Sequence, residues 1–374
     1  MRIAQVANFY GPRSGGLRTS MHALGRGYVA CGDRVLLVVP GDDDRVEDTP
    51  RGRVITLHSP LVPMSGGYRI ITRTGAVHDA LDEFAPDAIE VSDRTTLASL
   101  GPWARRRGIP TTFVAHERVD GLLGTVLPGP LRTAAPRIAA RHSRWIASRF
   151  DNLVATTAFA GDELARVGAP VETIPLGVDL VRFHPSRASG MVRSALAPDH
   201  EPLLLLASRL SPEKRPDLAI EAVRELGRRG RRVRMVVAGS GPLDREMRRR
   251  ATGLPIEFLG FVTDRETFAS LLATADALVA PGPIETFGLA ALEGLASGTP
   301  AVVNSASALP EVVGSAGAVA PSHAAAFADA IEDVLGRDAR ERRRAARARA
   351  EDFPWETTVA RMRALHASTL AGAR

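Results

Sequence analysis

Short apolar runs alternate along the chain with longer stretches in which apolar residues recur at helical spacing. Most of the apolar runs are continuous, which is typical of strands buried on both faces of a parallel sheet. Helices are predicted between most of them, for example at residues 216–229 and 242–252. Strands are expected in two series, at residues 3–8, 35–39, 54–57, 88–91, 111–115, 153–156 and 171–174, and then at 203–207, 233–238, 256–259, 277–280, 301–304 and 316–320. Repeated strand–helix units of this kind predict an α/β protein with doubly wound sheets.

A polar, proline-containing stretch without a strand pattern, residues 179–201, separates the two series. We therefore expect two domains, at residues 1–180 and 181–354, and 374 residues suffice for two cores of this size. Residues 355–374 predict a last helix that packs back on the N-terminal domain. The Arg- and Ala-rich residues 337–350 are interpreted as a solvated helix.

Composition indicates a soluble globular protein, with 45% hydrophobic and 24% charged residues. No apolar run reaches the roughly 18 residues that a membrane-spanning helix needs, and the first residues lack the pattern of a signal peptide. The single cysteine, Cys31, can form no internal disulfide and has no metal-ligand spacing around it. We expect a cytoplasmic protein with no metal site.

Basic residues exceed acidic ones, for a formal charge of +6, and they are almost all arginine. Of the 48 Lys and Arg residues, Lys214 is the only lysine. Codon bias towards arginine, with one lysine left by chance, is an alternative to a functional explanation. A lysine is, however, a compact point charge that a planar guanidinium cannot always replace at a phosphate, so Lys214 is a candidate for phosphate binding.

Candidate chemistry in the second half of the chain follows the strands, because ligands of open α/β sheets bind beyond the carboxyl ends of the strands. Arg209 and Lys214 lie on the segment that follows the strand at 203–207. Two cations on one such loop can both reach a diphosphate through charge-assisted hydrogen bonds. A solvated turn before a helix is the alternative.

The segment 281–293, with the sequence PGPIETFGLAALE, follows the strand at 277–280. Its prolines exclude regular structure, and a helix is predicted to begin near Gly288 with free N–H groups that suit a phosphate or sugar hydroxyls. Glu285 precedes that helix and Glu293 lies in its second turn. A helix-terminal charge for Glu285 and a surface position for Glu293 remain as alternatives. Gly239 and Gly241 resemble a nucleotide-binding turn, but a plain tight turn explains them at least as well. Asp264 is predicted to be a helix N-cap.

The first strand is followed by residues 9–19, FYGPRSGGLRT, in which Gly15 and Gly16 would let the backbone approach a ligand. A plain turn between strand and helix is the alternative. Dinucleotide spacing of glycines is absent, which disfavours a dehydrogenase. Arg13 and Arg18 could meet a phosphate of donor or acceptor. His116 follows a later strand at the edge where ligands bind, which favours a functional role over a purely structural one. Asp93 follows another strand and is a weaker candidate, for contact with an acceptor hydroxyl.

Residues 130–150 contain no acidic side chain. Basic side chains recur through them, and Leu131, Ala135, Ile138, Trp145 and Phe150 are predicted to share much of one helical face. The basic residues are Arg132, Arg137, Arg141, Arg144, Arg149 and His142. Such a helix is typical of binding at a membrane surface, and a core helix with solvated arginines is the alternative. Nucleic-acid binding is disfavoured because aromatic residues make up only 5% of the chain.

The combination of Gly15-Gly16, His116, Arg209 with Lys214, and Glu285 with Glu293 resembles the family 4 glycosyltransferases, and the resemblance covers essentially the whole chain. It implies two Rossmann-like domains facing a cleft, the GT-B architecture, and a retaining reaction without a metal or tightly bound cofactor. Arg209 and Lys214 would hold the donor diphosphate, and Glu285 would lie beside the sugar. Glu293 would accept hydrogen bonds from the ribose, Phe287, Gly288 and Leu289 would offer backbone N–H groups, and His116 would contact the sugar.

Within that family, residues 5–19, 90–94 and 280–293 are similar to mannosyltransferases that act on phosphatidylinositol mannosides. This resemblance implies GDP-mannose as donor, an anionic inositol lipid as acceptor, an α-1,6 linkage and a peripheral position on the inner face of the cell membrane. Other donors or a small-molecule acceptor remain open, as does a nucleotide-sugar epimerase of the same architecture. A non-catalytic membrane or nucleic-acid binder would also account for the positive charge.

Overall fold

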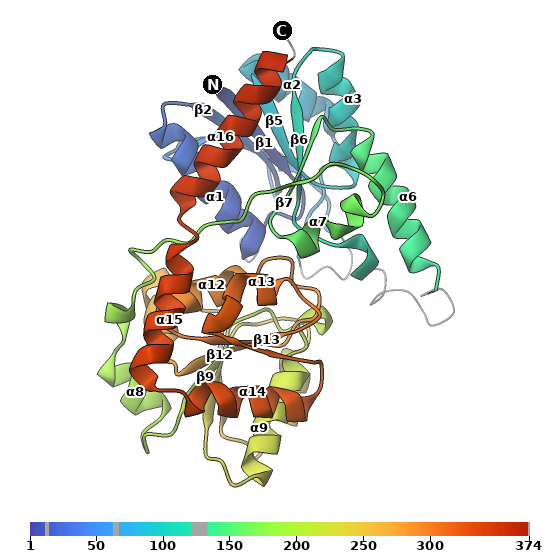
Figure 1. Cartoon of the computed structure of the whole chain (residues 1–374). Coiled ribbons are helices and arrows are strands. Elements are labelled where there is room, and N and C mark those ends of the chain that lie inside the picture. The colour runs from blue at the N-terminus through green and yellow to red at the C-terminus, as the bar shows by residue number, and fades with distance from the viewer. Residues whose placement is uncertain (12–14, 63–66, 122–132, 373–374) are drawn as a thin grey trace. The chain divides into compact units, whose positions relative to one another are not determined.

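The computed structural model describes residues 1–11, 15–62, 67–121 and 133–372 (Figure 1). The chain folds into two compact units: one comprises Met1–Gly177 and Trp355–Arg374, the other Val178–Pro354. The boundary thus lies slightly before residue 180. The last helix, α16 (Trp355–Gly372), belongs to the first unit.

The first unit is built on an eight-stranded sheet with the order β3-β4-β2-β1-β5-β6-β7-β8. Its strands are β1 (Arg2–Ala7), β2 (Arg34–Gly41), β3 (Arg45–Thr49), β4 (Gly52–His58), β5 (Ala88–Ser92), β6 (Thr111–Ala115), β7 (Asn152–Ala155) and β8 (Glu172–Thr173). All neighbours pair in parallel except β3 and β4. The hydrophobic pattern missed β3 because its residues are polar and mostly exposed, and its pairing comes from a hairpin rather than from burial.

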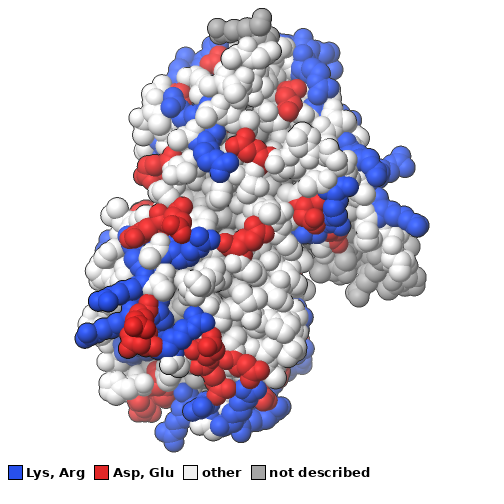
Figure 2. All heavy atoms as spheres, viewed as in Figure 1, with Lys and Arg blue, Asp and Glu red and all other residues white. Residues whose placement is uncertain are grey.

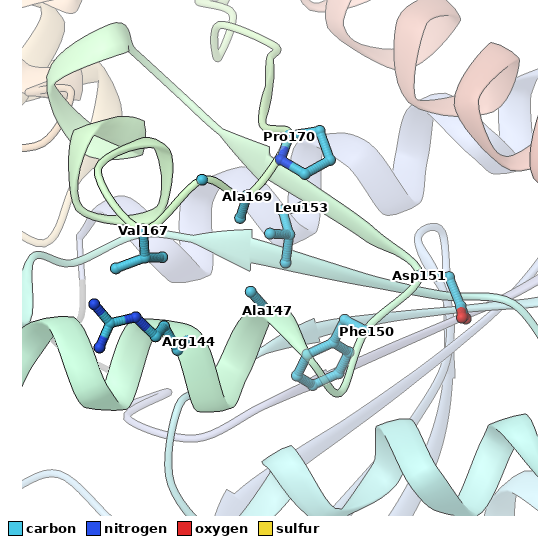
Figure 3. Close-up of a pocket in the computed structure, with 9 residues that line it drawn as sticks. Arg144, Ala147, Phe150, Asp151, Leu153, Val167, Ala169 and Pro170 are labelled. Carbon is cyan, nitrogen blue, oxygen red and sulfur yellow. The ribbon is translucent and has the colours of Figure 1, made fainter.

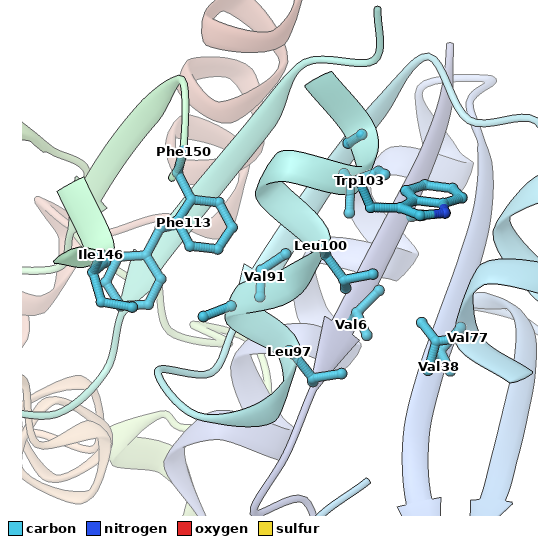
Figure 4. Close-up of a cluster of buried hydrophobic side chains, with 14 of the residues drawn as sticks. Val6, Val38, Val77, Val91, Leu97, Leu100, Trp103, Phe113, Ile146 and Phe150 are labelled. Carbon is cyan, nitrogen blue, oxygen red and sulfur yellow. The ribbon is translucent and has the colours of Figure 1, made fainter. Parts of the chain in front are cut away.

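Helices cover both faces of this sheet. Side chains of α2 (Thr74–Phe84), α3 (Leu100–Arg105), α6 (Ala135–Ala147) and α7 (Ala158–Ala165) form one buried cluster with residues of the strands. Figure 4 shows part of it, with Val6 and Val91 near Leu97 and Leu100, and Phe113 beside Ile146 and Phe150. The alternate strand residues, such as Ile3 and Leu37, face α1 (Gly16–Ala30) and α16. Continuous apolar strands are required because both faces are buried.

The C-terminal helix α16 is fixed to the first unit by apolar packing and by buried polar contacts. Val359 and Met362 pack in the cluster around α1, and His366 bonds to the buried Glu90 over 2.8 Å between Nε2 and Oε1. Glu90 also accepts hydrogen bonds from Tyr28 and Gln5. Burial alone would raise the pKa of Glu90, but these three partners hold it below its ordinary value.

The second unit contains a six-stranded parallel sheet with the order β11-β10-β9-β12-β13-β14. The strands are β9 (Leu203–Leu206), β10 (Arg234–Ala238), β11 (Ile256–Gly260), β12 (Ala277–Ala280), β13 (Ala301–Asn304) and β14 (Ala318–Ala320). Helix α9 (Pro216–Arg228) packs against α14 (Ala324–Gly336), and α12 (Leu289–Ala296) packs against α15 (Ala339–Glu351) (Figure 1). The unit also contains α8 (Gly190–Leu196), α10 (Asp244–Arg250), α11 (Arg265–Thr274) and α13 (Leu309–Val313).

The arginines of α15 form the solvated surface that the sequence predicted only in part: Arg340 and Arg344 are exposed, whereas the others are half-buried. Several of the half-buried arginines donate to backbone carbonyl groups at or near the carboxyl ends of other helices. Arg342 reaches Leu335 near the end of α14, Arg343 reaches Ala275 after α11, and Arg347 reaches Ala296 in α12. The last carbonyl groups of a helix have no partner within it, so these guanidinium groups satisfy acceptors that would otherwise be left unpaired.

Candidate functional site

Two loops of the second unit meet at the carboxyl edge of its sheet, because β9 and β12 are neighbours and run in the same direction. Lys214 ends a short 3₁₀ helix, Pro212–Lys214, after β9, and Gly282 lies in the loop after β12. A Cβ atom on Gly282 would lie 3.3 Å from the Cα of Lys214 and 3.2 Å from the carbonyl oxygen of Glu213. The two predicted donor-binding segments are therefore in contact.

Lys214 and Glu285 form an ion pair in this region. The Nζ atom of Lys214 donates to Oε2 of Glu285 over 2.5 Å, and both side chains are partly exposed. An ammonium group has three protons to donate, so this bond engages only one of them. Glu285 thus holds the ammonium group of Lys214 near the start of α12.

Gly288 connects this pair to the amino end of α12. Its φ of +79° and ψ of 62° belong to the left-handed region, which a residue with a side chain occupies only with strain. A Cβ on Gly288 would lie 3.2 Å from Cγ of Glu285 and 2.2 Å from Cδ2 of Leu309. Within the described ranges, no protein acceptor is recorded for the backbone N–H groups of Phe287, Gly288 and Leu289. Free N–H groups at the start of a helix are able to bind an anion.

The loop before α12 is fixed by hydrogen bonds from the end of β13 and the segment that follows it. The side-chain amide of Asn304, which is buried, donates to the carbonyl of Pro281 over 2.8 Å. The N–H of Ala308 donates to the carbonyl of Glu285 over 2.9 Å. The Phe287 ring is buried against Phe353. The Phe287 ring is therefore not available to a ligand, and a contact through its backbone N–H, which the resemblance implies, stays a prediction.

Arg209 lies on the same loop as Lys214. Its Nη2 donates to Oε1 of Glu213 over 3.0 Å, so Glu213 is a partner that the sequence did not indicate. A Cβ on Gly239 would lie 1.8 Å from the carbonyl oxygen of Ser208, and one on Gly241 would lie 2.4 Å from that of Leu210. Because these two glycines lack side chains, their turn packs closely against the backbone of the Arg209 loop, which supports the interpretation as a tight turn.

Glu293 is buried in the second turn of α12, which excludes a surface position. Burial raises its pKa, although Arg265 opposes this effect, and Nη2 of Arg265 donates to Oε1 of Glu293 over 2.6 Å. The guanidinium of Arg265 lies over the rings of Phe183 and Phe268. Arg265 follows Asp264, whose predicted role as the N-cap of α11 is confirmed.

His116 follows β6 in the first unit, at the carboxyl edge of that sheet. Its Nε2 lies 3.1 Å from the hydroxyl oxygen of Ser92 at the end of β5. Burial lowers the pKa of His116 to about 4; Arg94 adds to this effect and Glu90 opposes it. His116 is therefore neutral at physiological pH and can act as a hydrogen-bonding group without a charge.

The segment after His116 is fixed to α7 by ionic contacts that the sequence analysis missed. Arg94 donates to Glu163 over 3.0 Å and to the carbonyl of Glu117 over 2.6 Å. Glu163 in turn accepts from the N–H of Asp120. Asp93 accepts from the N–H groups of Thr95 and Leu97, both over 2.9 Å. Its carboxylate holds this turn, and a contact of Asp93 with an acceptor hydroxyl stays a prediction.

The glycine loop of the first unit leads directly into α1. Gly15 is the residue before the helix, Gly16 is its first residue, and no other atom lies within 4 Å of a Cβ built on either of them. The first turn of α1 contains no acidic residue, and Arg18 lies in it, half-buried. Arg13 lies outside the described residues. Among those described, no group of three or more His, Cys, Asp or Glu residues could hold a metal ion.

Helix α6 exposes a basic and apolar face. Arg137, Arg141 and Arg144 are exposed, and they share the surface with Ile138 and Trp145, which are 48% and 38% exposed. Ala135 and Phe150 are buried instead, so the single apolar face predicted for this segment is wrong, and Leu131 lies outside the described residues. Basic side chains project at the position of α6 in Figure 2. Within the described ranges, no helix could cross a membrane.

A hollow of about 290 Å³ lies at the carboxyl end of α6. Figure 3 shows Ala147, Leu153, Val167 and Pro170 around it, with Arg144 and Asp151 at its sides. It lies near the start of β7, and so at the edge of the sheet opposite to His116. Arg144 is the only predicted site residue among those that line it. We therefore locate the functional site at the carboxyl ends of the strands and not in this hollow.

The contact of Ser92 with His116 leads to a testable prediction. We expect Ser92→Ala to lower kcat/KM about fivefold, because a hydrogen bond of this kind contributes about 1 kcal/mol. Since His116 is neutral, the pH dependence of kcat/KM should show no step near pH 6.5 in either protein. Measurement of kcat/KM from pH 5.5 to 8 checks both points. Ser99→Ala, an exposed hydroxyl, is the control, and a step near pH 6.5 that disappears in His116→Gln would contradict the neutral state.

Comparison with known proteins shows which family combines these features. A family model described as Glycosyltransferase Family 4 matches residues 14–182, and one described as Glycosyl transferases group 1 matches residues 191–352. A GDP-mannose-dependent alpha-(1-6)-phosphatidylinositol dimannoside mannosyltransferase of Mycobacterium tuberculosis is 48% identical over 97% of this chain and 95% of its own length. The chain belongs to the family 4 glycosyltransferases.

Other family 4 relatives and solved structures are more distant. A GDP-mannose-dependent alpha-mannosyltransferase of Mycolicibacterium smegmatis is 28% identical over 81% of this chain and 79% of its own length. A sucrose-phosphate synthase of Thermosynechococcus elongatus superposes with a TM-score of 0.78 at 22% identity, over 99% of both chains. Anabaena HepE, solved with UDP, gives a TM-score of 0.75 at 17% identity, over 98% of this chain and all of its own. These structures establish the GT-B fold of this family 4 glycosyltransferase.

Proposed function

We propose that this glycosyltransferase moves mannose from GDP-mannose to a phosphatidylinositol mannoside and forms an α-1,6 linkage. The observation that carries the proposal is the 48% identity to the M. tuberculosis mannosyltransferase over nearly the full length of both chains. The Lys214–Glu285 pair and the open helix start at Gly288 provide the chemistry that such a donor needs.

On the donor side, the departing GDP develops negative charge as the bond to mannose breaks. In this proposal Lys214, Arg209 and the N–H groups at the start of α12 receive that charge, and because the fold holds them in place beforehand they lower the barrier. Glu285 orients Lys214 and lies beside the sugar, and Glu293 accepts from the ribose hydroxyls. Catalysis would then need no metal and no tightly bound cofactor.

On the acceptor side, we propose that the first unit binds the inositol lipid and that neutral His116 contacts the transferred sugar. The acceptor hydroxyl attacks from the face that GDP leaves, and the departing phosphate takes its proton, so the anomeric configuration is retained. No protein nucleophile is assigned. The bond from sugar to phosphate breaks, the bond from sugar to acceptor oxygen forms, and the proton goes to GDP.

The experiment that tests this function is mannose transfer in defined vesicles. The protein is incubated with GDP-mannose and vesicles that contain phosphatidylinositol dimannoside, with UDP-glucose and ADP-glucose as alternative donors. We expect a product one hexose heavier only with GDP-mannose, and an α-1,6 linkage by NMR. Hydrolysis of the donor without transfer would contradict the acceptor, and an epimer formed from the donor alone would favour the epimerase class.

We further propose that α6 attaches the enzyme to an anionic membrane surface. Arg137, Arg141 and Arg144 are exposed on one side of this helix together with Ile138 and Trp145. Basic residues near anionic lipid contribute about 1 kcal/mol each, and the exposed tryptophan suits the headgroup region. The lipid acceptor proposed above would itself lie at such a surface.

Replacement of the three α6 arginines by glutamine should weaken binding to anionic vesicles by about 3 kcal/mol, which is roughly 100-fold. Vesicle co-sedimentation at low and high salt measures this effect. Arg228, Arg245 and Arg340 are exposed residues of the second unit, and their replacement by glutamine removes the same charge elsewhere. An equal loss of binding in both triple variants would show that net charge, and not α6, attracts the membrane.

A further inference from the structure

A stripe of basic side chains lies along one side of α1, and of its members only Arg18 was named above as a candidate for phosphate binding. Arg18, His22 and Arg26 are four residues apart, so they occupy one helix face on successive turns. The hydroxyl of Tyr10, which follows β1, forms a short hydrogen bond with Nε2 of His22. The guanidinium of Arg18 lies 5.8 Å from the centre of the Tyr10 ring.

A third arginine reaches the stripe from the β3–β4 hairpin. Arg51 lies in the turn of that hairpin, and a Cβ on Gly25 of α1 would lie only 2.8 Å from the carbonyl oxygen of Arg51. The hairpin turn is therefore in contact with the helix. The Nε atom of Arg51 is buried, and among the described residues it has no hydrogen-bond partner.

Positive charge exceeds negative charge in this cluster. Burial and then the charges of Arg51, Arg18 and Arg26 lower the pKa of His22 to about 3. Glu47 is the acidic group whose charge acts on Tyr10, and its carboxylate already lies 3.5 Å from Arg45. A half-buried cluster of like charges is costly unless an anion offsets it.

We propose that Tyr10, Arg18, His22 and Arg51 form a subsite for a phosphate group. Guanidinium groups bind phosphate oxygens through pairs of parallel hydrogen bonds, and the Tyr10 hydroxyl supplies one more polar group. Tyr10 follows β1, whose neighbour β5 ends at Ser92, so Tyr10 and His116 share one edge of the sheet. Arg51 precedes β4, which runs parallel to β1 and β2, so its backbone lies at the opposite edge. The ligand is a phosphate ester, either in a lipid headgroup or in a soluble compound. The lipid source rests on the proposed function; the phosphate subsite does not.

The test adds inorganic phosphate, and separately phosphatidylinositol vesicles, to the full-length protein and to Arg51→Gln. Arg53→Gln is the matched control, because Arg53 is exposed, lies two residues away and pairs with Asp48. We expect phosphate to raise the Tm of the wild type and of Arg53→Gln, with at least roughly tenfold weaker binding in Arg51→Gln. We also expect the ring proton signals of His22 to move when phosphate is added to the wild type.

If vesicles move the His22 signals at a lower total phosphate concentration than inorganic phosphate does, the ligand is a lipid headgroup. If inorganic phosphate alone moves them, the ligand is a soluble phosphate ester. Unmoved His22 signals with both additions, or equal responses in the two variants, would overturn the proposal. The change of the His22 ring proton signals in the wild type tests the proposal even if Arg51→Gln does not fold. Mannose transfer is measured separately, so the failure of the subsite and the failure of the proposed function are distinguishable.

Discussion

Lys214→Ala is expected to lower kcat/KM on the order of 100- to 1,000-fold, about 3–4 kcal/mol, which is typical of the loss of one group that stabilises developing negative charge. The structure supports this expectation because the Lys214 ammonium is held beside the start of α12 through Glu285. Steady-state transfer of mannose from GDP-mannose is the measurement. Lys214→Arg keeps the charge but not the compact geometry, so its kcat/KM should lie between those of the wild type and Lys214→Ala.

The control for this loss is Arg340→Ala, which removes an exposed positive charge from α15 in the same unit. It should leave kcat/KM unchanged. Thermal unfolding of both variants separates a loss of activity from a loss of structure. Turnover of Lys214→Ala within a few-fold of the wild type would exclude Lys214 from the diphosphate site.

Gly288→Ala should be the second most damaging change. The left-handed backbone at this position costs a residue with a side chain about 1–2 kcal/mol. The new methyl would also approach Leu309 to 2.2 Å and Glu285 to 3.2 Å. We expect the start of α12 to shift, which moves the amides away from the diphosphate and lowers kcat/KM tenfold or more in addition to the loss of stability.

Gly253 provides a closely matched control for this substitution. It has the same φ of +79°, but no other atom lies within 4 Å of its Cβ position. Gly253→Ala should therefore lower the free energy of unfolding through the backbone effect alone and leave kcat/KM unchanged. Equal catalytic effects of the two substitutions would show that the start of α12 does not meet the donor.

Those parts of the fold and site that depend on local pattern could be predicted from the sequence. Continuous apolar runs located the strands of both sheets, and the rule that ligands bind after the strand ends selected His116, Lys214 and Gly288. Asp264 was recognised as an N-cap because that role depends on the two or three residues that follow it. Each of these features is local in sequence.

Features that depend on distant partners could not be predicted in this way. Strand β3 is polar and forms only through its hairpin with β4. Arg265 meets Glu293, and Ser92 meets His116, across separations that no local pattern encodes. The half-buried arginines of α15 looked like solvated charges because sequence does not show which carbonyl groups lie opposite them. The faces of α6 were misassigned because its exposed apolar residues have the spacing of buried ones.

The most direct test of the account uses the fact that Lys214 is the only lysine of the chain. Labelling with [ε-¹³C]lysine then gives one NMR signal from the group that is proposed to hold the diphosphate. We predict that GDP moves this signal and that guanosine, which lacks the phosphates, does not. A protein that binds GDP, as shown by a rise in Tm, while the Lys214 signal stays in place would contradict the account.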